Sequence, residues 1–435
     1  MLGAILAMAV VIDLGPSTDI AGLVEQLGAS RYASRIAAEG KLVGLGRMSL
    51  PALRVGAASK DAEIRARSAA LLERIEGASL IEPTPIRLNL RQATLAEAID
   101  EINRQSGFRI SLVPESSEAA AHRRVTLQER DPLTFWQAMD ALCKAGGVRP
   151  LSEIGPSPQP PGEGFSLGDG PLTELGPSSD FGPFRVRLSS VHLQSEVRPG
   201  RSPEVVASRE FFLQLSLAAE PRLAIARDGA ARVTAALDDR GRSLMVAQGS
   251  QIIRRTSGYF GLSQASTVAF RLDLDFPEPE VAQLRLVRGV VPVRVETRKS
   301  DPLVVPLSAR PDQVFRRGDA ELTLVEARQA SPTQPATFRV AIRQTGVATQ
   351  PDDPSGLRRP GLRSDSILHR VEVLDAMGVV LPWFPSVTRQ AEAETQLTIT
   401  VGRRGDGGEP ATLRYYETIQ TKTEVSFEFR DIPIR

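Results

Sequence analysis

Cysteine and histidine are scarce in this chain of 435 residues, and their scarcity limits the chemistry that it can perform. Cys143 is the single cysteine, so neither an intramolecular disulfide nor a thiolate metal cage can form within the chain. The histidines are His122, His192 and His369, which lie in different segments and offer little for acid–base catalysis. We therefore expect no bound metal, no cofactor and no enzymatic activity.

Sequence motifs of common cofactor enzymes are also missing. The chain has no Gly-x-x-x-x-Gly-Lys-Ser/Thr loop for nucleotide phosphates, no Gly-x-Gly-x-x-Gly turn for dinucleotides and no His-Glu-x-x-His helix. Each of these motifs supplies backbone or side-chain groups that a specific chemistry requires. Their joint absence favours a protein that binds and does not react.

An excess of charge of either sign is lacking as well, since 53 Lys and Arg residues face 52 Asp and Glu residues. Without a basic excess the chain lacks the attraction that non-specific nucleic-acid binding needs, so we expect no nucleic-acid partner. No apolar run approaches the ~20 residues of a bilayer-spanning helix, so we expect no transmembrane helix. The length suggests roughly three globular domains.

The first segment is an apolar run, Met1 to Ile12, followed by Asp13 and a Gly15-Pro16 turn. This length matches the core of a secretory signal peptide, although no Lys or Arg precedes the run. We therefore favour an extracytoplasmic protein, periplasmic or secreted. The alternative is a cytoplasmic protein whose first segment is buried.

Residues 18–80 show the three- and four-residue spacing of apolar positions that is typical of helices. Asp19 and Asp61 stand where helix N-cap residues are expected. The segments Leu50 to Arg54 and Asp61 to Arg67 resemble a HEAT-type helical repeat, which implies helices stacked in pairs. A simple amphipathic bundle describes the same pattern nearly as well.

Residues 81–170 alternate between strand and helix patterns. Thr94 is expected to cap one helix and Gly107 to end it, while Trp136 and Cys143 are expected on or beside the buried face of a second helix. The first strand is expected to be half-buried, because apolar and polar residues alternate in it: Ile86, Leu88 and Leu90 inward, Arg87, Asn89 and Arg91 outward.

The segment Leu95 to Phe108, with the sequence Leu-Ala-Glu-Ala-Ile-Asp-Glu-Ile-Asn-Arg-Gln-Ser-Gly-Phe, resembles the small STN domain at the N-terminus of secretins and TonB-dependent receptors. In those families the domain is a periplasmic module for protein interaction and signalling. The resemblance implies an interaction domain outside the cytoplasm and a protein partner in the cell envelope.

Beyond a stretch rich in Pro, Gly and Ser, the helical period gives way to strict alternation of apolar and polar residues, as in Thr267 to Phe276. Many short strands without helices between them predict antiparallel sheets packed as sandwiches of immunoglobulin-like type. A Leu-Asp-x-x-Gly hairpin occurs at Leu237 to Gly241 and again at Leu374 to Gly378, which indicates a tandem duplication.

The predicted fold class is therefore multidomain: an α-helical N-terminal segment, a small α+β domain, and an all-β remainder of two antiparallel sandwiches. This combination resembles multidomain protein families of planctomycete bacteria, and the resemblance implies an architecture without an assigned activity. The predicted parts are a signal-like segment 1–17, a HEAT-like segment 18–80, an STN-like domain 81–170, a linker 171–182, and β-sandwiches 183–308 and 309–435.

Two features of the β half suggest ligand sites. Asp238, Asp239 and Asp375 invite a calcium interpretation, but Asp before Gly at a tight turn is more often turn chemistry. Trp383 and Phe384 lie between prolines after a hairpin strand, where an exposed aromatic loop could contact a partner or a sugar ring. The favoured alternative is that they close the end of the sandwich.

Three functions remain after these exclusions. The leading hypothesis is a non-catalytic extracytoplasmic interaction or scaffold protein that binds a protein partner through its STN-like and β-sandwich domains. The alternative is binding of a carbohydrate or another cell-surface polymer by the sandwich around Trp383 and Phe384. An enzyme with an unrecognised site would need His192 or His369 beside a carboxylate in a polar cleft.

Overall fold

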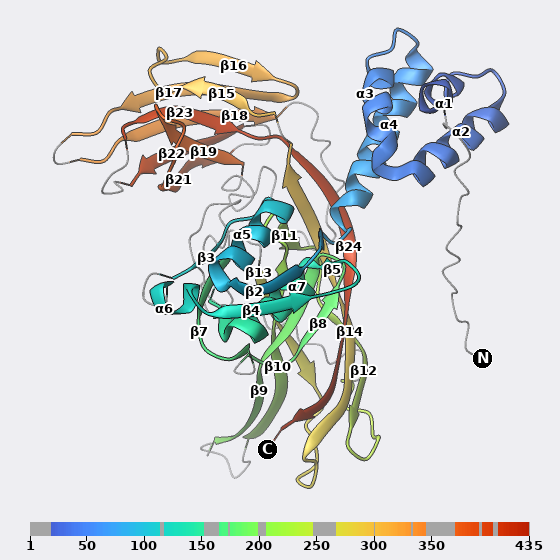
Figure 1. Ribbon diagram of the computed structural model, residues 1–435, viewed down its shortest axis with the longest axis vertical. Coiled ribbons are helices and arrows are strands. Elements are labelled where there is room, and N and C mark those ends of the chain that lie inside the picture. Colours follow the sequence, from blue (N-terminus) through green and yellow to red (C-terminus); the bar gives the residue numbers. More distant parts are fainter. Residues whose placement is uncertain are drawn as a thin grey trace. The chain divides into compact units, whose positions relative to one another are not determined.

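The computed structural model describes residues 19–113, 117–151, 165–172, 175–198, 206–246, 267–299, 301–331, 334–344, 370–390, 394–402 and 408–434. The signal-like segment 1–17 lies outside these residues. The chain forms two compact units, one up to Glu82 and one from Pro83 onward (Figure 1). Helices come first and antiparallel sheets dominate the rest, which confirms the predicted fold class.

The first unit is helical, and its first and last α-helices begin at the predicted caps Asp19 and Asp61. The Asp19 carboxylate accepts the Gly22 N–H at 2.9 Å, and Asp61 accepts two N–H groups at 2.8 and 3.0 Å. Gly46 adopts a φ of 53°, which ends the second helix. Leu27, Leu42 and Leu53 are fully buried between the helices. The helices are α1 (Ile20–Gln26), α2 (Tyr32–Leu45), the 3-10 turn η1 (Gly46–Ser49), α3 (Leu50–Ala57) and α4 (Ala62–Leu80).

The small domain comprises the elements between Pro85 and Asp169. Thr94 and Thr134 each cap a helix through a reciprocal capping box with Glu97 and Gln137. Strand pairs β1–β5 and β2–β4 are antiparallel, and β7 lies between β3, to which it is parallel, and β6. The elements are β1 (Pro85–Ile86), β2 (Asn89–Thr94), α5 (Leu95–Ser106), β3 (Ile110–Leu112), α6 (Ser117–Ala121), β4 (Arg124–Gln128), β5 (Leu133–Thr134), α7 (Phe135–Gly146), β6 (Val148–Pro150) and β7 (Phe165–Asp169).

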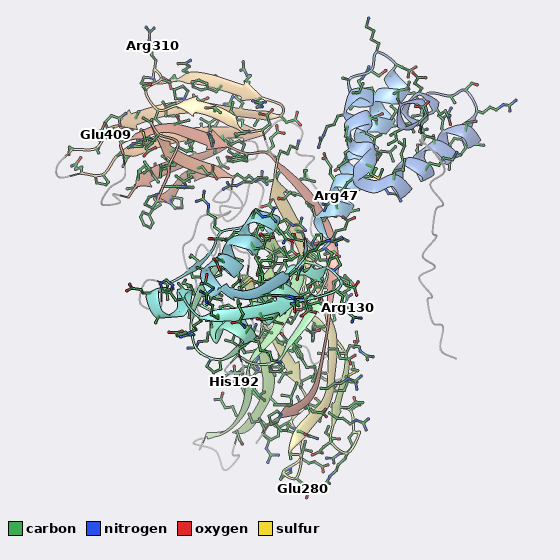
Figure 2. All side chains as sticks on the ribbon, viewed as in Figure 1. Arg47, Arg130, His192, Glu280, Arg310 and Glu409 are labelled. Atoms are coloured by element: carbon green, nitrogen blue, oxygen red, sulfur yellow. The ribbon has the colours of Figure 1, made fainter. Side chains whose placement is uncertain are left out.

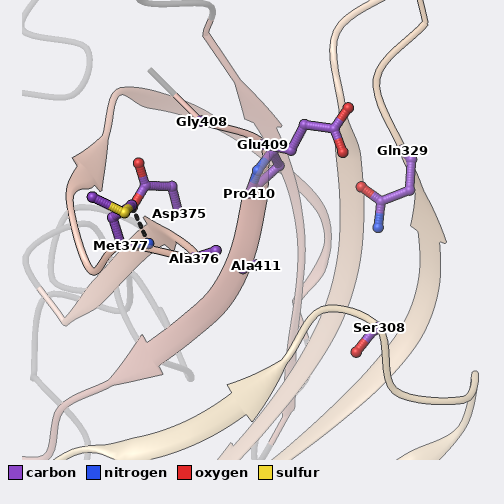
Figure 3. Close-up of a pocket in the computed structure, with 9 residues that line it drawn as sticks. All are labelled: Ser308, Gln329, Asp375, Ala376, Met377, Gly408, Glu409, Pro410 and Ala411. Atoms are coloured by element: carbon purple, nitrogen blue, oxygen red, sulfur yellow. Dashed lines mark hydrogen bonds between the residues drawn. The ribbon is translucent and has the colours of Figure 1, made fainter. Parts of the chain in front are cut away.

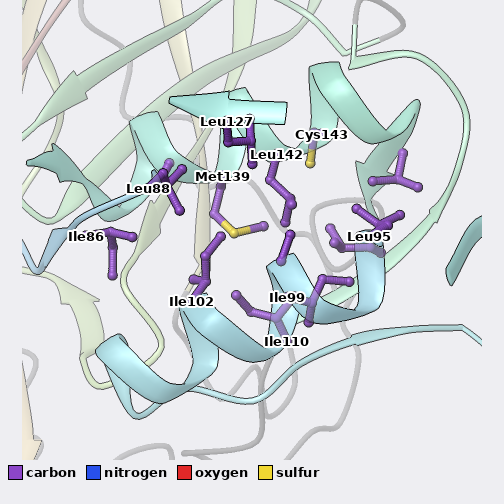
Figure 4. Close-up of a cluster of buried hydrophobic side chains, with 14 of the residues drawn as sticks. Ile86, Leu88, Leu95, Ile99, Ile102, Ile110, Leu127, Met139, Leu142 and Cys143 are labelled. Carbon is purple, nitrogen blue, oxygen red and sulfur yellow. The ribbon is translucent and has the colours of Figure 1, made fainter. Parts of the chain in front are cut away.

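The core of the small domain lies between its two longer helices and its strands. Figure 4 shows Ile99 and Ile102 of α5 directed toward Met139 and Leu142 of α7. Cys143 is 1% exposed in the same cluster and acts as a small apolar residue. Burial alternates as predicted, with Ile86 and Leu88 inward, Leu90 partly buried, and Arg87, Asn89 and Arg91 outward. The predicted single strand is instead divided into β1 and β2, with residues 87–88 between them.

The first sandwich has two antiparallel sheets. One has the order β13-β10-β9-β8; in the other, β14 pairs with β11, β12 and β24. Phe270 of β13 and Phe427 of β24 meet across the interior with ring centroids 6.3 Å apart, and both are buried. The strands are β8 (Ser178–Phe181), β9 (Phe184–Arg198), β10 (Val206–Ala219), β11 (Ala224–Arg227), β12 (Arg232–Asp238), β13 (Thr267–Leu274), β14 (Gln283–Arg298) and β24 (Thr418–Pro433).

The second sandwich pairs a sheet of order β15-β23-β19-β20 with one of order β16-β17-β18-β22-β21. One apolar cluster joins them, with Val373 and Tyr415 from the first sheet and Phe338 and Ile399 from the second. The strands are β15 (Leu303–Pro306), β16 (Gln313–Arg317), β17 (Ala320–Arg328), β18 (Thr337–Gln344), β19 (Val371–Asp375), β20 (Val380–Leu381), β21 (Trp383–Gln390), β22 (Glu394–Val401) and β23 (Pro410–Tyr415).

The two Leu-Asp-x-x-Gly hairpins share one geometry. The carboxylates of Asp238 and Asp375 each accept the backbone N–H groups two and four residues further on, at 2.8–3.0 Å. Gly241 and Gly378 adopt φ values of 80° and 81°, which other residues rarely do. Backbone N–H groups of the turn therefore occupy both aspartates, as the turn interpretation predicts.

Strand pairing does not follow the predicted boundaries. β24 lies within 309–435 but pairs with β14 of the first sandwich, from Gln283 opposite Pro433 to Arg298 opposite Thr418 (Figure 1). β15 lies within 183–308 but pairs with β23 of the second sandwich. β8 lies within the predicted linker 171–182 and pairs with β9. The alternation of apolar residues reveals the buried face of a strand but not its neighbour.

Candidate interaction site

A buried arginine joins the small domain to the first sandwich. Arg185 of β9 is 2% exposed. Its guanidinium donates to Asp140 of α7 at 2.6 and 2.7 Å and to Asp180 of β8 at 2.7 and 2.8 Å. Each carboxylate thus receives two hydrogen bonds from one planar guanidinium, and this fixes the orientation of the carboxylate as well as its distance from Arg185. We call this group the Arg185 clasp.

Aromatic packing supports the clasp. The guanidinium of Arg185 lies 5.0 Å from the ring centroid of Trp136, which is 1% exposed on α7. The Trp136 Nε1–H donates to the Pro183 carbonyl at 3.0 Å. Burial opposes the charge of Arg185, but the hydrogen bonds to Asp180 and Asp140 outweigh it and raise the pKa of the guanidinium above its usual value.

A second polar contact holds the start of the small domain. The carboxylate of Glu220, which is fully buried after β10, accepts the Thr84 N–H at 2.8 Å and the Thr84 hydroxyl at 2.6 Å. Arg222 donates to the same carboxylate at 3.0 Å. Ala218 of β10 also belongs to the apolar cluster of the small domain. The small domain is therefore held on the first sandwich by charge, hydrogen bonds and apolar packing together.

The outer face of the β2–β4 pair remains exposed and is polar and basic. Arg91 has the amide of Gln128 as its polar neighbour, and Arg124 donates to the Gln92 carbonyl at 2.8 Å. Arg87 forms no ion pair with any carboxylate of the described residues. Arg124 lies near the Glu97 carboxylate, whose pKa is lowered by hydrogen bonds from Thr94 and, to a smaller extent, by the charge of Arg124. Arg87 and Arg91 are therefore the cations of this face that form no ion pair among the described residues.

A groove of about 480 Å³ adjoins this face, between β2 and α5. We call it the β2–α5 groove. Gln105 bridges its end, since its Oε1 accepts the Arg87 N–H and its Nε2 donates to the Arg87 carbonyl, both at 2.8 Å. The groove is lined from the strand side by Arg87, Asn89 and Leu90 and from the helix side by Glu101, Arg104 and Gln105.

The predicted aromatic loop is a strand in the structure. Trp383 and Phe384 begin β21, which pairs with β22. Trp383 is half-buried and packs on the core of the second sandwich, whereas Phe384 is 58% exposed. Only one of the two rings is therefore presented to solvent, and their role in ligand binding remains a prediction.

A second hollow of about 350 Å³ lies at the Asp375 hairpin (Figure 3). The exposed Met377 forms part of its rim. Asp375 already accepts backbone hydrogen bonds, and Glu409 is directed away from it. Among the described residues, no group of three His, Cys, Asp or Glu side chains is placed to hold a metal ion.

The histidines do not form a catalytic arrangement in the described part of the chain. His192 lies exposed on β9 (Figure 2), where its Nε2 is 2.7 Å from the Ser190 hydroxyl and its ring stacks on Phe212 at 4.4 Å. The guanidinium carbon of Arg271 lies 3.5 Å from the centroid of the same phenyl ring. His122 is exposed after α6, and His369 lies outside the described residues.

Ser166 lies in a Gly-x-Ser-x-Gly motif, from Gly164 to Gly168, of the kind that hydrolases use for a nucleophilic serine. A nucleophile elbow requires a sharp strand-to-helix turn at the serine. Ser166 instead lies inside β7, opposite Ser111 of the parallel strand β3. Its backbone is held in a sheet, so this serine has no elbow geometry.

The sequence predicts Arg87 on a polar strand face but not its role, and it gives no indication of a role for Arg185. Arg185 follows Phe184 in an alternating strand, and nothing local signals that a second domain covers it. The link from Gln105 to Arg87, which lies two residues before β2, is likewise a contact between residues 18 positions apart. The burial of Arg185 becomes evident only in the three-dimensional structure, where the carboxylates of Asp140 and Asp180 both lie within hydrogen-bonding distance of its guanidinium.

No helix of the described residues is long and apolar enough to cross a membrane. Neither a family model, nor a curated protein, nor a solved structure matches this chain.

Proposed function

We propose that the chain is a non-catalytic, extracytoplasmic interaction or scaffold protein that holds a protein partner in the cell envelope. The supporting observation is the Arg185 clasp. It fixes the small domain on the first sandwich through Asp140 and Asp180, while the outer face of the β2–β4 pair stays exposed and carries Arg87 and Arg91. A fixed domain with an uncovered polar face suits a binding role, because little ordering entropy is lost on association.

Photo-crosslinking with the full chain tests this proposal. A photoreactive amino acid would replace Thr126 on the small domain in one variant and Val304 on β15 in another; both positions are exposed. We expect irradiation in cells to attach a defined envelope protein at position 126 at least. Absence of any protein adduct at both positions would contradict an interaction function.

Export is tested separately by mass spectrometry of the mature N-terminus together with cell fractionation. We expect the mature chain to begin after the apolar run Met1 to Ile12 and to be found outside the cytoplasm. A cytoplasmic protein that retains Met1 would contradict the extracytoplasmic part of the proposal and leave the interaction part to be judged by crosslinking.

Binding of a cell-surface polysaccharide is the alternative, favoured by the exposed ring of Phe384 on β21. Aromatic rings presented to solvent can stack on sugar rings. Glycan-array binding by the full chain that disappears in Phe384→Ala would support it. Equal binding by Phe384→Ala and the parent chain would exclude this strand as the site.

A further inference from the structure

We propose that the β2–α5 groove binds an extended, acidic segment of the partner protein, which pairs with β2 as an additional strand. This inference rests on the proposed interaction function and specifies its site and the chemistry of its partner. Three observations carry it: a free strand edge, a helix wall beside that edge, and arginine side chains without full compensation.

The free edge follows from the hydrogen-bond pattern of β2. Among the described strands, β2 pairs only with β4. Leu88 directly precedes β2, and its carbonyl accepts the Glu129 N–H at 3.0 Å, so this carbonyl faces the β4 side. Backbone groups of successive residues in an antiparallel strand point to opposite sides, so those of Arg87 and Asn89 face the groove.

Gln105 shows that this edge can accept a partner. Its side-chain amide both accepts from the Arg87 N–H and donates to the Arg87 carbonyl, as one residue of a neighbouring strand would. The next outward residue, Asn89, lines the groove. The Gln128 amide contacts its side-chain oxygen at 3.5 Å, but no side chain of the described residues bonds to its backbone. An exposed edge of this kind is a template for strand addition.

The charge of the groove selects an acidic segment. Arg104 donates to Glu101 at 2.6 and 2.9 Å, yet its side chain is 71% exposed. The pKa of Glu101 is lowered by the hydrogen bonds from Arg104 and then from Gln105, so its carboxylate is charged and neutralises one arginine. Arg87 remains as an uncompensated cation at the same edge. Side chains of an added strand alternate in direction, so carboxylates at every second position can face Arg87.

Peptide binding to the full chain tests the proposal. The probe is an eight-residue peptide in which Glu alternates with Val or Thr. Controls are the same peptide with Gln or Lys in place of Glu, and one N-methylated along a single edge so that it cannot pair with a strand. Fluorescence anisotropy would measure the affinities.

We expect the Glu peptide to bind and the affinity of the Gln peptide to be at least about tenfold lower. The Lys peptide and the N-methylated peptide should not bind. Arg87→Glu should weaken the Glu peptide at least about tenfold, since one attraction becomes a repulsion. Arg310→Glu, at an exposed arginine of the second sandwich (Figure 2), should leave binding unchanged.

Asn89→Pro is the variant for the backbone, because proline removes the outward N–H of Asn89 without touching the bonds of β2 to β4. We expect it to abolish peptide binding while circular dichroism and the unfolding midpoint stay close to those of the parent chain. The proposal would be overturned if the Glu peptide still bound to Asn89→Pro, or if the N-methylated peptide bound to the parent chain. Equal binding of the Glu and Gln peptides would also overturn it, and so would a failure of every peptide to bind.

The outcome separates this inference from the proposed function. A partner that still crosslinks at position 126 in Arg87→Glu and Asn89→Pro would leave the interaction function standing and overturn strand addition. Binding of single-stranded nucleic acid or anionic vesicles in preference to the Glu peptide would equally overturn it. Loss of the crosslink in both variants, with position 304 unaffected, is the result that we expect.

Discussion

Removal of the Arg185 side chain should destabilise the contact between the small domain and the first sandwich by about 3 kcal/mol. Breaking a buried ion pair by deleting one partner costs about 3–5 kcal/mol. The lower end applies here, because Asp140 and Asp180 are 38% and 29% exposed and can regain water. At about 2–4 °C per kcal/mol, Arg185→Ala should lower the melting temperature of this part by about 6–12 °C.

Differential scanning calorimetry would measure this effect, as would urea unfolding followed by the fluorescence of Trp136 in a Trp383→Phe background shared by all variants. Arg310→Ala is the matched control, because that arginine is exposed, and its melting temperature should equal that of the parent chain. A double-mutant cycle with Asp140→Ala isolates the pair and should give a coupling energy of at least about 1 kcal/mol. A coupling below about 0.5 kcal/mol, or equal melting of Arg185→Ala and Arg310→Ala, would refute the stabilising role of the clasp.

Three further predictions, two of them with a matched control variant, test other parts of the structure. Trp383→Ala should lower the free energy of unfolding by about 3 kcal/mol because the ring packs on the core, whereas Phe384→Ala should change it by less than about 0.5 kcal/mol, as chemical denaturation would show. Burial opposes the charge of Asp228, but Lys422 of β24 and Arg294 of β14 outweigh it and lower the pKa of its carboxyl. Its stabilising effect is therefore full above about pH 4 and is lost as the pH falls through the lowered pKa. Urea titrations should show a stability deficit of Asp228→Asn at pH 7 that shrinks as the pH is lowered below about 4. Gly289→Ala should cost about 1–3 kcal/mol, because a Cβ there would lie 2.4 Å from an aromatic carbon of β24, while Gly229→Ala, with 3.5 Å of room, should cost little in the same assay.

Local features of the fold could be predicted from the sequence because they depend on neighbouring residues. Asp19, Asp61 and Thr94 cap helices as predicted, since an N-cap interaction spans only two or three residues. Gly107 ends α5 in the left-handed conformation that glycine tolerates. The alternating strand before α5 is likewise local. These patterns sufficed for the fold class.

Pairing between distant strands could not be predicted in this way. Val425, Phe427 and Phe429 alternate as a half-buried strand should, but alternation is equally satisfied by a place in either sandwich. Their position against β14 depends on the shape of the whole first sandwich. The same holds for the β2–α5 groove. The alternation of apolar and polar residues predicts that Arg87 faces outward, but whether a strand edge is free depends on the pairing of the entire sheet.

The pairing of β14 with β24 has a consequence for the order of folding during synthesis. Arg288 and Glu428 are hydrogen-bonded across these strands although 140 residues separate them. At ribosomal rates of about 5–20 residues per second, about 7–28 s elapse between the synthesis of the two. During this interval the backbone groups of β14 that later pair with β24 have no partner strand, and this exposed edge can pair with a wrong strand. We therefore expect the first sandwich to close only after the whole of the second has been made.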